Sequence, residues 1–293
     1  MKVSFDYKIK EEMNIRDYLL SFYLAKSKVY KLFLENRVLI NNLPVKENYL
    51  LKIGDVLTIQ LDEDIDYTPQ NGNIEVLYED PYYLIINKPR GLIIYEDSKD
   101  KLGTVSNLVA GYYKKMGYHY NIRFCHRLDT ETTGVLVLCK DILCHSYMNH
   151  LISIHEIKRE YHLLCQGHLK NKIGRINLPI GHDRHNSKKM VITKSGSFAI
   201  TNYELLKEFK SYSYVKAILE TGRTHQIRLH FSTIGHPLLG DVLYGGDTKY
   251  MKYVALHSYK VKFYHPIYKK EIEVIKEEPS DFLKLLGKWY FES

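Results

Sequence analysis

The chain has 293 residues, with 42 Lys and Arg against 34 Asp and Glu, so its formal net charge is +8. This length allows one large core or two domains, and a positive surface favours a polyanionic partner such as nucleic acid, although basic composition alone also occurs in proteins with other partners. The sequence excludes a membrane-spanning helix, because no apolar run approaches the roughly 18 residues needed, and its four cysteines form no C-x-x-C pair.

We therefore expect an intracellular protein of the reducing cytoplasm, with no disulfide framework and no membrane partner.

The first sixty residues predict a small α+β unit. Apolar residues recur at spacings of three and four between Ile15 and Leu34, which is the pattern of two short helices. Two strand-like runs follow, and Asn41-Asn42 marks the first turn.

An acidic and polar segment, residues 62–75, then breaks all periodicity and is the best linker in the chain. Beyond it strand-like runs dominate and helices punctuate them, which predicts an α+β fold with a mixed, largely antiparallel central sheet flanked by helices. The predicted helices are 102–115, 142–152, 224–234 and 280–287. The predicted domain limits are 1–61 for the small domain, 62–75 for the linker and 76–293 for the large domain.

Charged residues gather in two segments of the large domain. "HRLDTETTG" (126–134) places Asp129 just before an apolar strand, where a lone aspartate is most often a cap or turn former. "ETGRTHQIRLHFSTIGHP" (220–237) predicts a helix capped by Thr224, with Arg223, His225 and Arg228 near its N-terminus. Backbone N–H groups and arginines together predict an anion-binding pocket there.

Two other interpretations of these segments explain less. His225 and His230 are five residues apart, which suits one helix face poorly, and no Cys/His cluster accompanies them, so we expect no metal site. "LDTET" is weakly similar to the Asp-x-Asp-x-Thr motif of aspartate phosphotransferases, but Glu131 stands where the second aspartate should be. That interpretation also leaves Arg127 unexplained.

The second predicted helix carries several cations on its outer face, which from charge alone indicates only a solvated helix face. However, residues 25–59, "AKSKVYKLFLENRVLINNLPVKENYLLKIGDVLTI", resemble the S4-type (alpha-L) RNA-binding domain, with Asn42 where that family usually has glycine. The resemblance implies an RNA-binding N-terminal domain. Its expected RNA contacts are Lys26, Lys28, Lys31 and Arg37.

The large domain resembles the RluA-type family of RNA pseudouridine synthases over nearly its whole length. The similarity lies in six ordered blocks, of which "GRTHQIR" is almost verbatim. These blocks are "VLYEDPYYLIINKPRGLIIY" (76–95), "HRLDTETTGVLVLCK" (126–140), "IKREYHLLCQG" (157–167), "LPIGHDRHNSKKMVI" (178–192), "TGRTHQIRLHFSTIGHPLLGD" (221–241) and "ALHSYKVKFYHP" (255–266).

The resemblance implies a role for several positions. Asp129 matches the essential catalytic aspartate, and Arg127 matches an arginine that helps to hold the flipped-out state of the RNA. Tyr161 matches the tyrosine that stacks on the target base, Arg228 the arginine that pairs with the catalytic carboxylate, and Leu256 an apolar residue against the base. The other expected substrate contacts are His126, Thr133, which replaces a usual serine, Arg223 and His225.

The family's reaction detaches a uridine base from its ribose, turns it and rejoins it through a ring carbon, so the resemblance implies an isomerase without cofactor or metal. Asp129 would act as a nucleophile on the ribose or as a base, and the family leaves both open. The implied partner is 23S-type RNA of the large ribosomal subunit, with transfer RNA as the alternative, and the implied state is a monomer. Rival interpretations are a non-catalytic RNA-binding or ribosome-assembly protein and a magnesium-dependent hydrolase or phosphotransferase.

Overall fold

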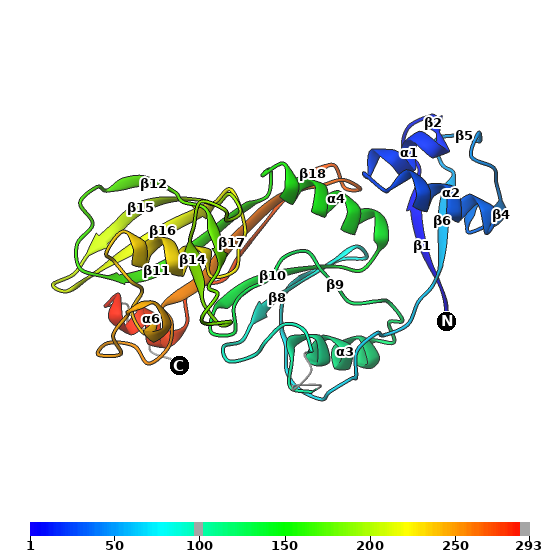
Figure 1. The fold of residues 1–293 in the computed structure, drawn as a ribbon. Helices are drawn as coiled ribbons and strands as arrows, with labels where there is room; N and C mark the ends of the chain where they lie inside the picture. Colours follow the sequence, from blue (N-terminus) through cyan, green and yellow to red (C-terminus); the bar gives the residue numbers. More distant parts are fainter. Residues whose placement is uncertain (97–101, 288–293) are drawn as a thin grey trace.

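The computed structural model describes residues 1–96 and 102–287, which form a small N-terminal sheet and a large central sheet (Figure 1). The N-terminal sheet is antiparallel, in the order β1-β6-β3-β4, and β2 pairs with β5 beside it. The elements of this unit are β1 (Lys2–Lys8), β2 (Met13–Asn14), α1 (Ile15–Ser21), α2 (Lys26–Leu34), β3 (Val38–Ile40), β4 (Leu43–Pro44), β5 (Leu50–Leu51) and β6 (Val56–Asp62).

The sequence prediction for this unit found the two helices and the later strands but missed β1. Val3, Phe5 and Tyr7 of β1 alternate with exposed residues and face the core, as expected for a strand with one buried face. Asn41 and Asn42 form the predicted turn between β3 and β4, with φ values of 50° and 69°. Asparagine tolerates this left-handed conformation better than most residues.

The central sheet has ten strands, and its main path is β12-β15-β16-β11-β17-β10-β8-β7. Every neighbouring pair is antiparallel except β10 and β17, which confirms the predicted mixed, largely antiparallel sheet. The strands are β7 (Glu75–Glu79), β8 (Tyr83–Lys88), β9 (Arg123–Phe124), β10 (Thr133–Cys139), β11 (Lys158–Gln166), β12 (Ile173–Asn177), β15 (Ile200–Glu208), β16 (Tyr212–Leu219), β17 (Leu256–His265) and β18 (Lys270–Ile275). A separate hairpin joins β13 (Ile180–His182) and β14 (Met190–Ile192).

Helices α3 (Val105–Met116) and α4 (Ile142–Ser153) cover opposite faces of β8 and β10 (Figure 1). Val105 and Val109 pack with Leu136 and Leu138 on one face, whereas Met148 packs with Val135 and Val137 on the other. None of the helices in the described parts of the chain is long and apolar enough to cross a membrane. The helices of the large unit are α3 (Val105–Met116), α4 (Ile142–Ser153), α5 (Gln226–Thr233), the 3-10 helix η1 (Val242–Tyr244) and α6 (Ser280–Leu285).

The α-helices α3, α4, α5 and α6 match the four predicted helices, with shifted N-termini in α3 and α5. Helix α3 begins at Val105 and not at 102, because the Thr104 and Asn107 side chains form a capping box that fixes the start. Helix α5 begins at Gln226, and the prediction that Thr224 caps it was wrong. Its N-cap is His225, in a left-handed conformation with φ 56°.

The small unit packs directly against the large one. The Tyr7 hydroxyl of β1 donates a buried 2.7 Å hydrogen bond to Asp141, which is the N-cap of α4. Ile142 and Leu143 of α4 belong to the same apolar cluster as the core of the small unit. Glu63, in the connecting segment, forms an ion pair with Arg123. Buried apolar and polar contacts therefore hold the two units together.

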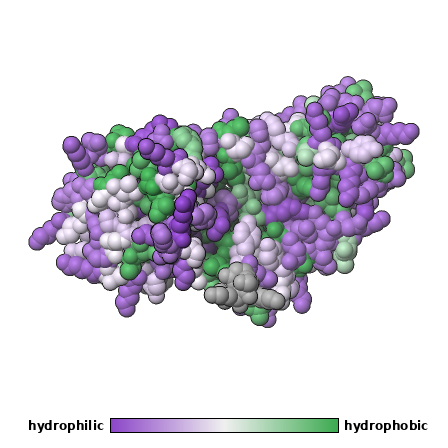
Figure 2. All heavy atoms as spheres, in the orientation of Figure 1, coloured by the Kyte–Doolittle hydropathy of each residue, from purple (hydrophilic) through white to green (hydrophobic). Residues whose placement is uncertain are grey.

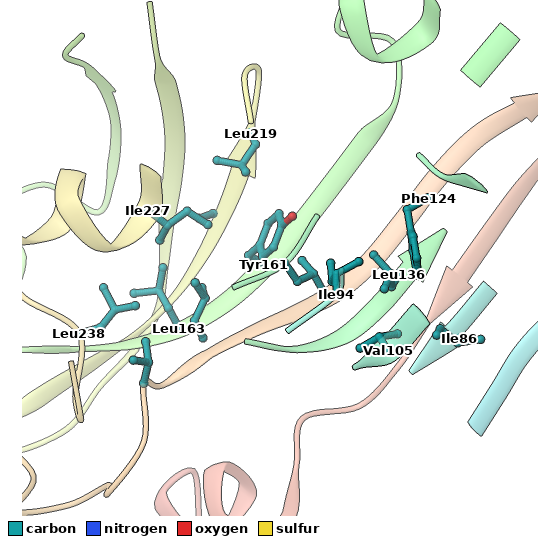
Figure 3. Close-up of a cluster of buried hydrophobic side chains, with 14 of the residues drawn as sticks. Ile86, Ile94, Val105, Phe124, Leu136, Tyr161, Leu163, Leu219, Ile227 and Leu238 are labelled. Atoms are coloured by element: carbon teal, nitrogen blue, oxygen red, sulfur yellow. The ribbon is translucent and has the colours of Figure 1, made fainter. Parts of the chain in front are cut away.

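The largest apolar cluster lies along the central sheet, and Tyr161 lies near the middle of the part drawn in Figure 3. The close approach of β10 to β17 depends on Gly134, the last residue of "HRLDTETTG". Its φ is +107°, and a Cβ atom there would lie 2.2 Å from the Ser258 carbonyl oxygen. Glycine is required at this strand entrance for both reasons.

A buried polar cluster anchors the strand that carries Tyr161. Glu278 Oε1 lies 2.5 Å from His162 Nδ1 and accepts a 2.5 Å hydrogen bond from the Tyr214 hydroxyl. Burial opposes ionisation of this carboxyl, but the hydrogen bonds from His162 and Tyr214 outweigh it and lower the pKa of Glu278 to about 2. The cluster ties the segment before α6 to β11 and β16.

We expect this cluster to make stability depend on pH. Because the pKa of Glu278 is lowered on folding, its stabilising contribution is complete above about pH 4.5 and is lost as the pH falls toward about 2. The Glu278→Gln variant should therefore lose less of its free energy of unfolding than the wild type between about pH 6 and pH 3. Urea denaturation at both pH values measures this, with the exposed neighbour Glu277→Gln as control. Equal pH dependence in wild type and Glu278→Gln would contradict the assignment.

Candidate active site

An open pocket of about 480 Å³ lies where β11 and β17 meet the loop before β10 and the start of α5. It contains most of the residues that the sequence singled out. The predicted residues that line it are His126, Arg127, Asp129, Tyr161, Arg223, His225, Arg228 and Leu256. Segments about a hundred residues apart in the sequence therefore meet in this pocket. The face of the molecule shown in Figure 2 is mostly hydrophilic, with smaller apolar areas.

The side chain of a buried lysine, Lys88, binds the loop that carries Asp129. Lys88 Nζ donates hydrogen bonds of 3.0, 2.9 and 3.0 Å to the carbonyl oxygens of Pro89, Thr130 and Thr132. Burial lowers the pKa of Lys88 to about 8, although the nearby Asp129 carboxylate opposes this shift. The backbone N–H of Thr132 also bonds to the Asp129 carbonyl oxygen at 3.1 Å. The position of Asp129 is thus fixed by its backbone.

Thr133 is the one expected substrate contact that does not line this pocket. It is buried, and its hydroxyl lies 2.7 Å from Nδ1 of His257 on β17. The other ring nitrogen of His257 bonds to the Lys276 carbonyl oxygen at 2.8 Å. Thr133 therefore joins β10 to β17 in this structure.

Arg228 lies between two carboxylates. Its Nε and Nη2 atoms each donate a 2.7 Å hydrogen bond to Asp241, whereas Nη1 lies 3.4 Å from Asp129 Oδ2. Burial disfavours the charged guanidinium, but the two carboxylates outweigh this and raise the pKa of Arg228. The expected contact with Asp129 is present, and Asp241, which the sequence analysis did not single out, is the closer partner.

His225 approaches the same carboxylate from the N-terminus of α5. Its Nε2 lies 3.9 Å from Asp129 Oδ2, and its Nδ1 lies 2.9 Å from the Tyr244 hydroxyl. Burial lowers the pKa of His225, with Arg228 acting in the same direction and Asp129 against it. The neutral ring is therefore favoured near neutral pH.

Tyr161 and Leu256 form the apolar side of the pocket. Both are about 95% buried, with exposures of 5% and 6%, and they lie on the neighbouring strands β11 and β17. Figure 3 shows the Tyr161 ring between Leu219 and Ile94, near the middle of the drawn apolar cluster. Burial raises the pKa of Tyr161, so its hydroxyl stays protonated near neutral pH. A planar, uncharged surface thus faces the carboxylate region.

The polar rim of the pocket contains exposed arginines and a histidine that bonds to the backbone. Arg127 and Arg223 are exposed, and Arg223 Nε donates to the Phe198 carbonyl oxygen at 3.0 Å. His126 is fixed, because its Nε2 accepts a 3.2 Å hydrogen bond from the backbone N–H of Val137. Burial, helped by the nearby Arg159, lowers the pKa of His126 to about 3. His126 therefore supports the loop as an uncharged side chain.

The cations expected to bind RNA on the small unit have different surroundings. Lys26, Lys28 and Lys31 are exposed on α2, and Lys31 lies 3.6 Å from Glu35. Arg37 forms an ion pair with Asp62 and lies 3.8 Å from Glu35, so nearby carboxylates already neutralise much of its charge. Within the described residues, no three His, Cys, Asp or Glu side chains are grouped as metal ligands.

Comparisons with known proteins identify the family of this chain. The family described as RNA pseudouridylate synthase matches residues 82–233. The uncharacterized RNA pseudouridine synthase YhcT of Bacillus subtilis is 37% identical over 259 residues, covering 87% of this chain and 85% of that protein. The ribosomal large subunit pseudouridine synthase D of Yersinia pestis is 33% identical over 282 residues, covering 90% of this chain and 86% of that protein.

A solved structure shows the same fold. The human RNA pseudouridylate synthase domain containing 4 superimposes with a TM-score of 0.60 at 24% sequence identity, covering 73% of this chain and 92% of that one. The family predicted from the six sequence blocks is confirmed by the family match and by relatives that are more than 30% identical. The chain therefore belongs to the RluA-type family of RNA pseudouridine synthases and is an isomerase that acts on RNA.

Proposed function

We propose that this enzyme converts specific uridines of large-subunit ribosomal RNA to pseudouridine through Asp129, after the target base has left its stack. The observation that carries the proposal is the Asp129 carboxylate itself, held in an open pocket beside Arg228 and opposite Tyr161 and Leu256. A carboxylate, a cation and an apolar planar surface are the groups that this isomerisation needs in one place.

The reaction breaks the bond between ribose C1′ and uracil N1 and forms a bond between C1′ and uracil C5. The hydrogen on C5 leaves as a proton and N1 gains one, so nothing is oxidised or hydrolysed. Asp129 would attack C1′ as a nucleophile or remove a ribose proton as a base, and in both routes it must be ionised. Arg228 Nη1 lies 3.4 Å from Asp129 Oδ2 and places a positive charge beside the carboxylate.

The pocket reaches only a base that has left the helix, and unstacking a base costs a few kcal/mol. Tyr161 and Leu256 would recover part of this cost by stacking on and packing against the uracil, since base–aromatic stacking contributes about 1–3 kcal/mol. The exposed Arg127 stands at the rim, where it would hold the opened RNA. The positions of Tyr161, Leu256 and Arg127 in the pocket and the chemistry of their side chains support these roles.

We also propose that residues 1–61 form an RNA-binding domain of the S4 type and that 62–75 connect it to a catalytic domain at 76–293, of which 97–101 and 288–293 lie outside the described residues. The exposed Lys26, Lys28 and Lys31 of α2 supply the positive surface. Because Arg37 is paired with Asp62, we expect it to contribute less than the lysines.

The choice of RNA rests on the names of the relatives and on the net charge of +8. Several relatives are named ribosomal large subunit pseudouridine synthase D, and they are 31–34% identical to this chain. The charge favours a large polyanion, and we expect the enzyme to act as a monomer in the cytoplasm, where such RNA is present.

Mapping pseudouridines in total RNA from cells with and without this protein tests the target. We expect at least one large-subunit uridine to lose its modification when the protein is absent and to regain it on complementation. Loss confined to transfer RNA would assign the enzyme to that substrate and overturn the ribosomal proposal. An unchanged map in every RNA would contradict the proposed target class as a whole.

A further inference from the structure

The two oxygens of the Asp129 carboxylate have different surroundings. Arg228 Nη1 and His225 Nε2 both approach Oδ2, at 3.4 and 3.9 Å. Within the described residues no hydrogen bond reaches Oδ1, and both side chains contact the carboxylate at Oδ2. The protein therefore engages Oδ2 more than Oδ1.

His225 holds its place at a cost in backbone conformation. Its φ of 56° is left-handed, which is uncommon for residues other than glycine, although Asn, Asp and His adopt it more often than the rest. Such strain persists where surrounding contacts determine the position, and it gathers at functional sites. The contact that determines the ring position here is the 2.9 Å bond between His225 Nδ1 and the Tyr244 hydroxyl.

Tyr244 also fixes which ring nitrogen carries the proton. Its oxygen accepts a 2.8 Å hydrogen bond from the backbone N–H of Met190, so the hydroxyl proton remains available for His225 Nδ1. The opposite tautomer would leave that proton without an acceptor and turn the lone pair of Nε2 toward a carboxylate. Nδ1 therefore accepts and Nε2–H faces Asp129.

The same tyrosine supports the arginine. The Arg228 guanidinium lies over the Tyr244 ring, 5.2 Å from its centroid, which favours the cation electrostatically. One residue of η1 thus contacts both groups that approach Oδ2.

We propose that Tyr244 and His225 are positioning residues that, with Arg228, hold Asp129 Oδ2 and leave Oδ1 directed at the ribose. This inference rests on the proposed catalytic role of Asp129. At 3.9 Å the His225 contact is longer than a hydrogen bond, and a closure of about 1 Å in the RNA complex would complete it, as is common for catalytic hydrogen bonds that tighten on substrate binding.

Two substitutions of His225 separate positioning from backbone strain. In His225→Gln the amide nitrogen reaches about as far as Nε2 and can donate to Asp129. In His225→Asn the amide reaches only the position of Nδ1, although asparagine suits the left-handed backbone better. We expect Asn to preserve or improve stability and to lower kcat about a hundredfold, as removal of one oriented donor does. Gln restores the donor but not the acceptor for the Tyr244 hydroxyl, so we expect its kcat to fall about tenfold, which is less than in Asn.

Tyr244→Phe is the third variant and removes only the hydroxyl. We expect kcat to fall roughly ten- to a hundredfold, with KM changed less than about twofold, because Arg228 still has the ring but His225 loses its orientation. The probe is RNA carrying 5-tritiated uridine, taken from cells that lack this protein. Tritium release gives kcat and KM, and thermal unfolding confirms that each variant is folded.

The outcomes are distinct. Equal losses in His225→Gln and His225→Asn, a loss confined to KM, or kcat within about twofold of the wild type in Tyr244→Phe and His225→Asn would each overturn the positioning role. If the wild type releases no tritium, or if Asp129→Asn retains its rate, the proposed function itself fails. If the wild type is active and Asp129→Asn inactive, a negative result in the other variants counts against this inference alone.

Discussion

Replacing Asp129 by asparagine is expected to lower turnover by on the order of 10⁴-fold while leaving RNA binding close to that of the wild type. Asparagine has nearly the same shape but can act neither as a nucleophile nor as a base at this position. The fold should persist, because the loop is held by Lys88 through backbone carbonyls and Arg228 keeps its closer partner Asp241.

This prediction is measured by following pseudouridine in nucleoside digests under single-turnover conditions, with RNA affinity from filter binding. Arg127→Ala is the useful comparison, because it should weaken the RNA complex and leave the carboxylate intact. Turnover of Asp129→Asn within about a hundredfold of the wild type would remove Asp129 from the chemistry.

The second large effect is on stability. Asp241 is 1% exposed and makes two 2.7 Å hydrogen bonds to Arg228, so Asp241→Ala leaves a buried guanidinium with the 3.4 Å contact to Asp129 and the Tyr244 ring. Removal of one partner from such a pair costs about 3–5 kcal/mol. We expect the free energy of unfolding to fall by that amount, together with the activity.

A matched control is available on the surface. Arg175 and Glu220 form a similar two-bond pair, at 3.3 and 3.2 Å, but their side chains are 53% and 35% exposed. Glu220→Ala should therefore cost no more than about 1 kcal/mol. Urea denaturation of both variants compares the two pairs. A loss in Asp241→Ala no larger than that in Glu220→Ala would show that Arg228 does not depend on this partner.

Much of the fold could be predicted from the sequence, because most of its helices and strands carry a local signal. The apolar periodicity of α4 and the alternation or apolar runs of β8 and β10 follow directly from which face each buries. The strand β1 has an equally clear alternation and was overlooked. The start of α5 had no such signal, since nothing local predicts a left-handed histidine as its N-cap.

Some roles in the candidate site could be predicted from sequence motifs, whereas others depend on contacts made only in the fold. Asp129, Tyr161 and Arg228 lie in segments with recognisable motifs, and the structure brings them to one pocket. Lys88 and Asp241 also lie in sequence blocks that resemble the family. Their roles, however, depend on contacts with Thr132 and Arg228, which are 44 and 13 positions away. Thr133 and Arg37 were predicted as RNA contacts, and the structure adds that each has a side-chain partner within the protein, His257 and Asp62.

The central claim is that this chain isomerises uridine in RNA through Asp129 without a metal. Incubating large-subunit ribosomal RNA that carries 5-tritiated uridine with the purified protein in EDTA tests it most directly. We expect tritium release by the wild type and none above background by Asp129→Asn. No release by the wild type, release that EDTA abolishes, or equal release by both proteins would contradict it.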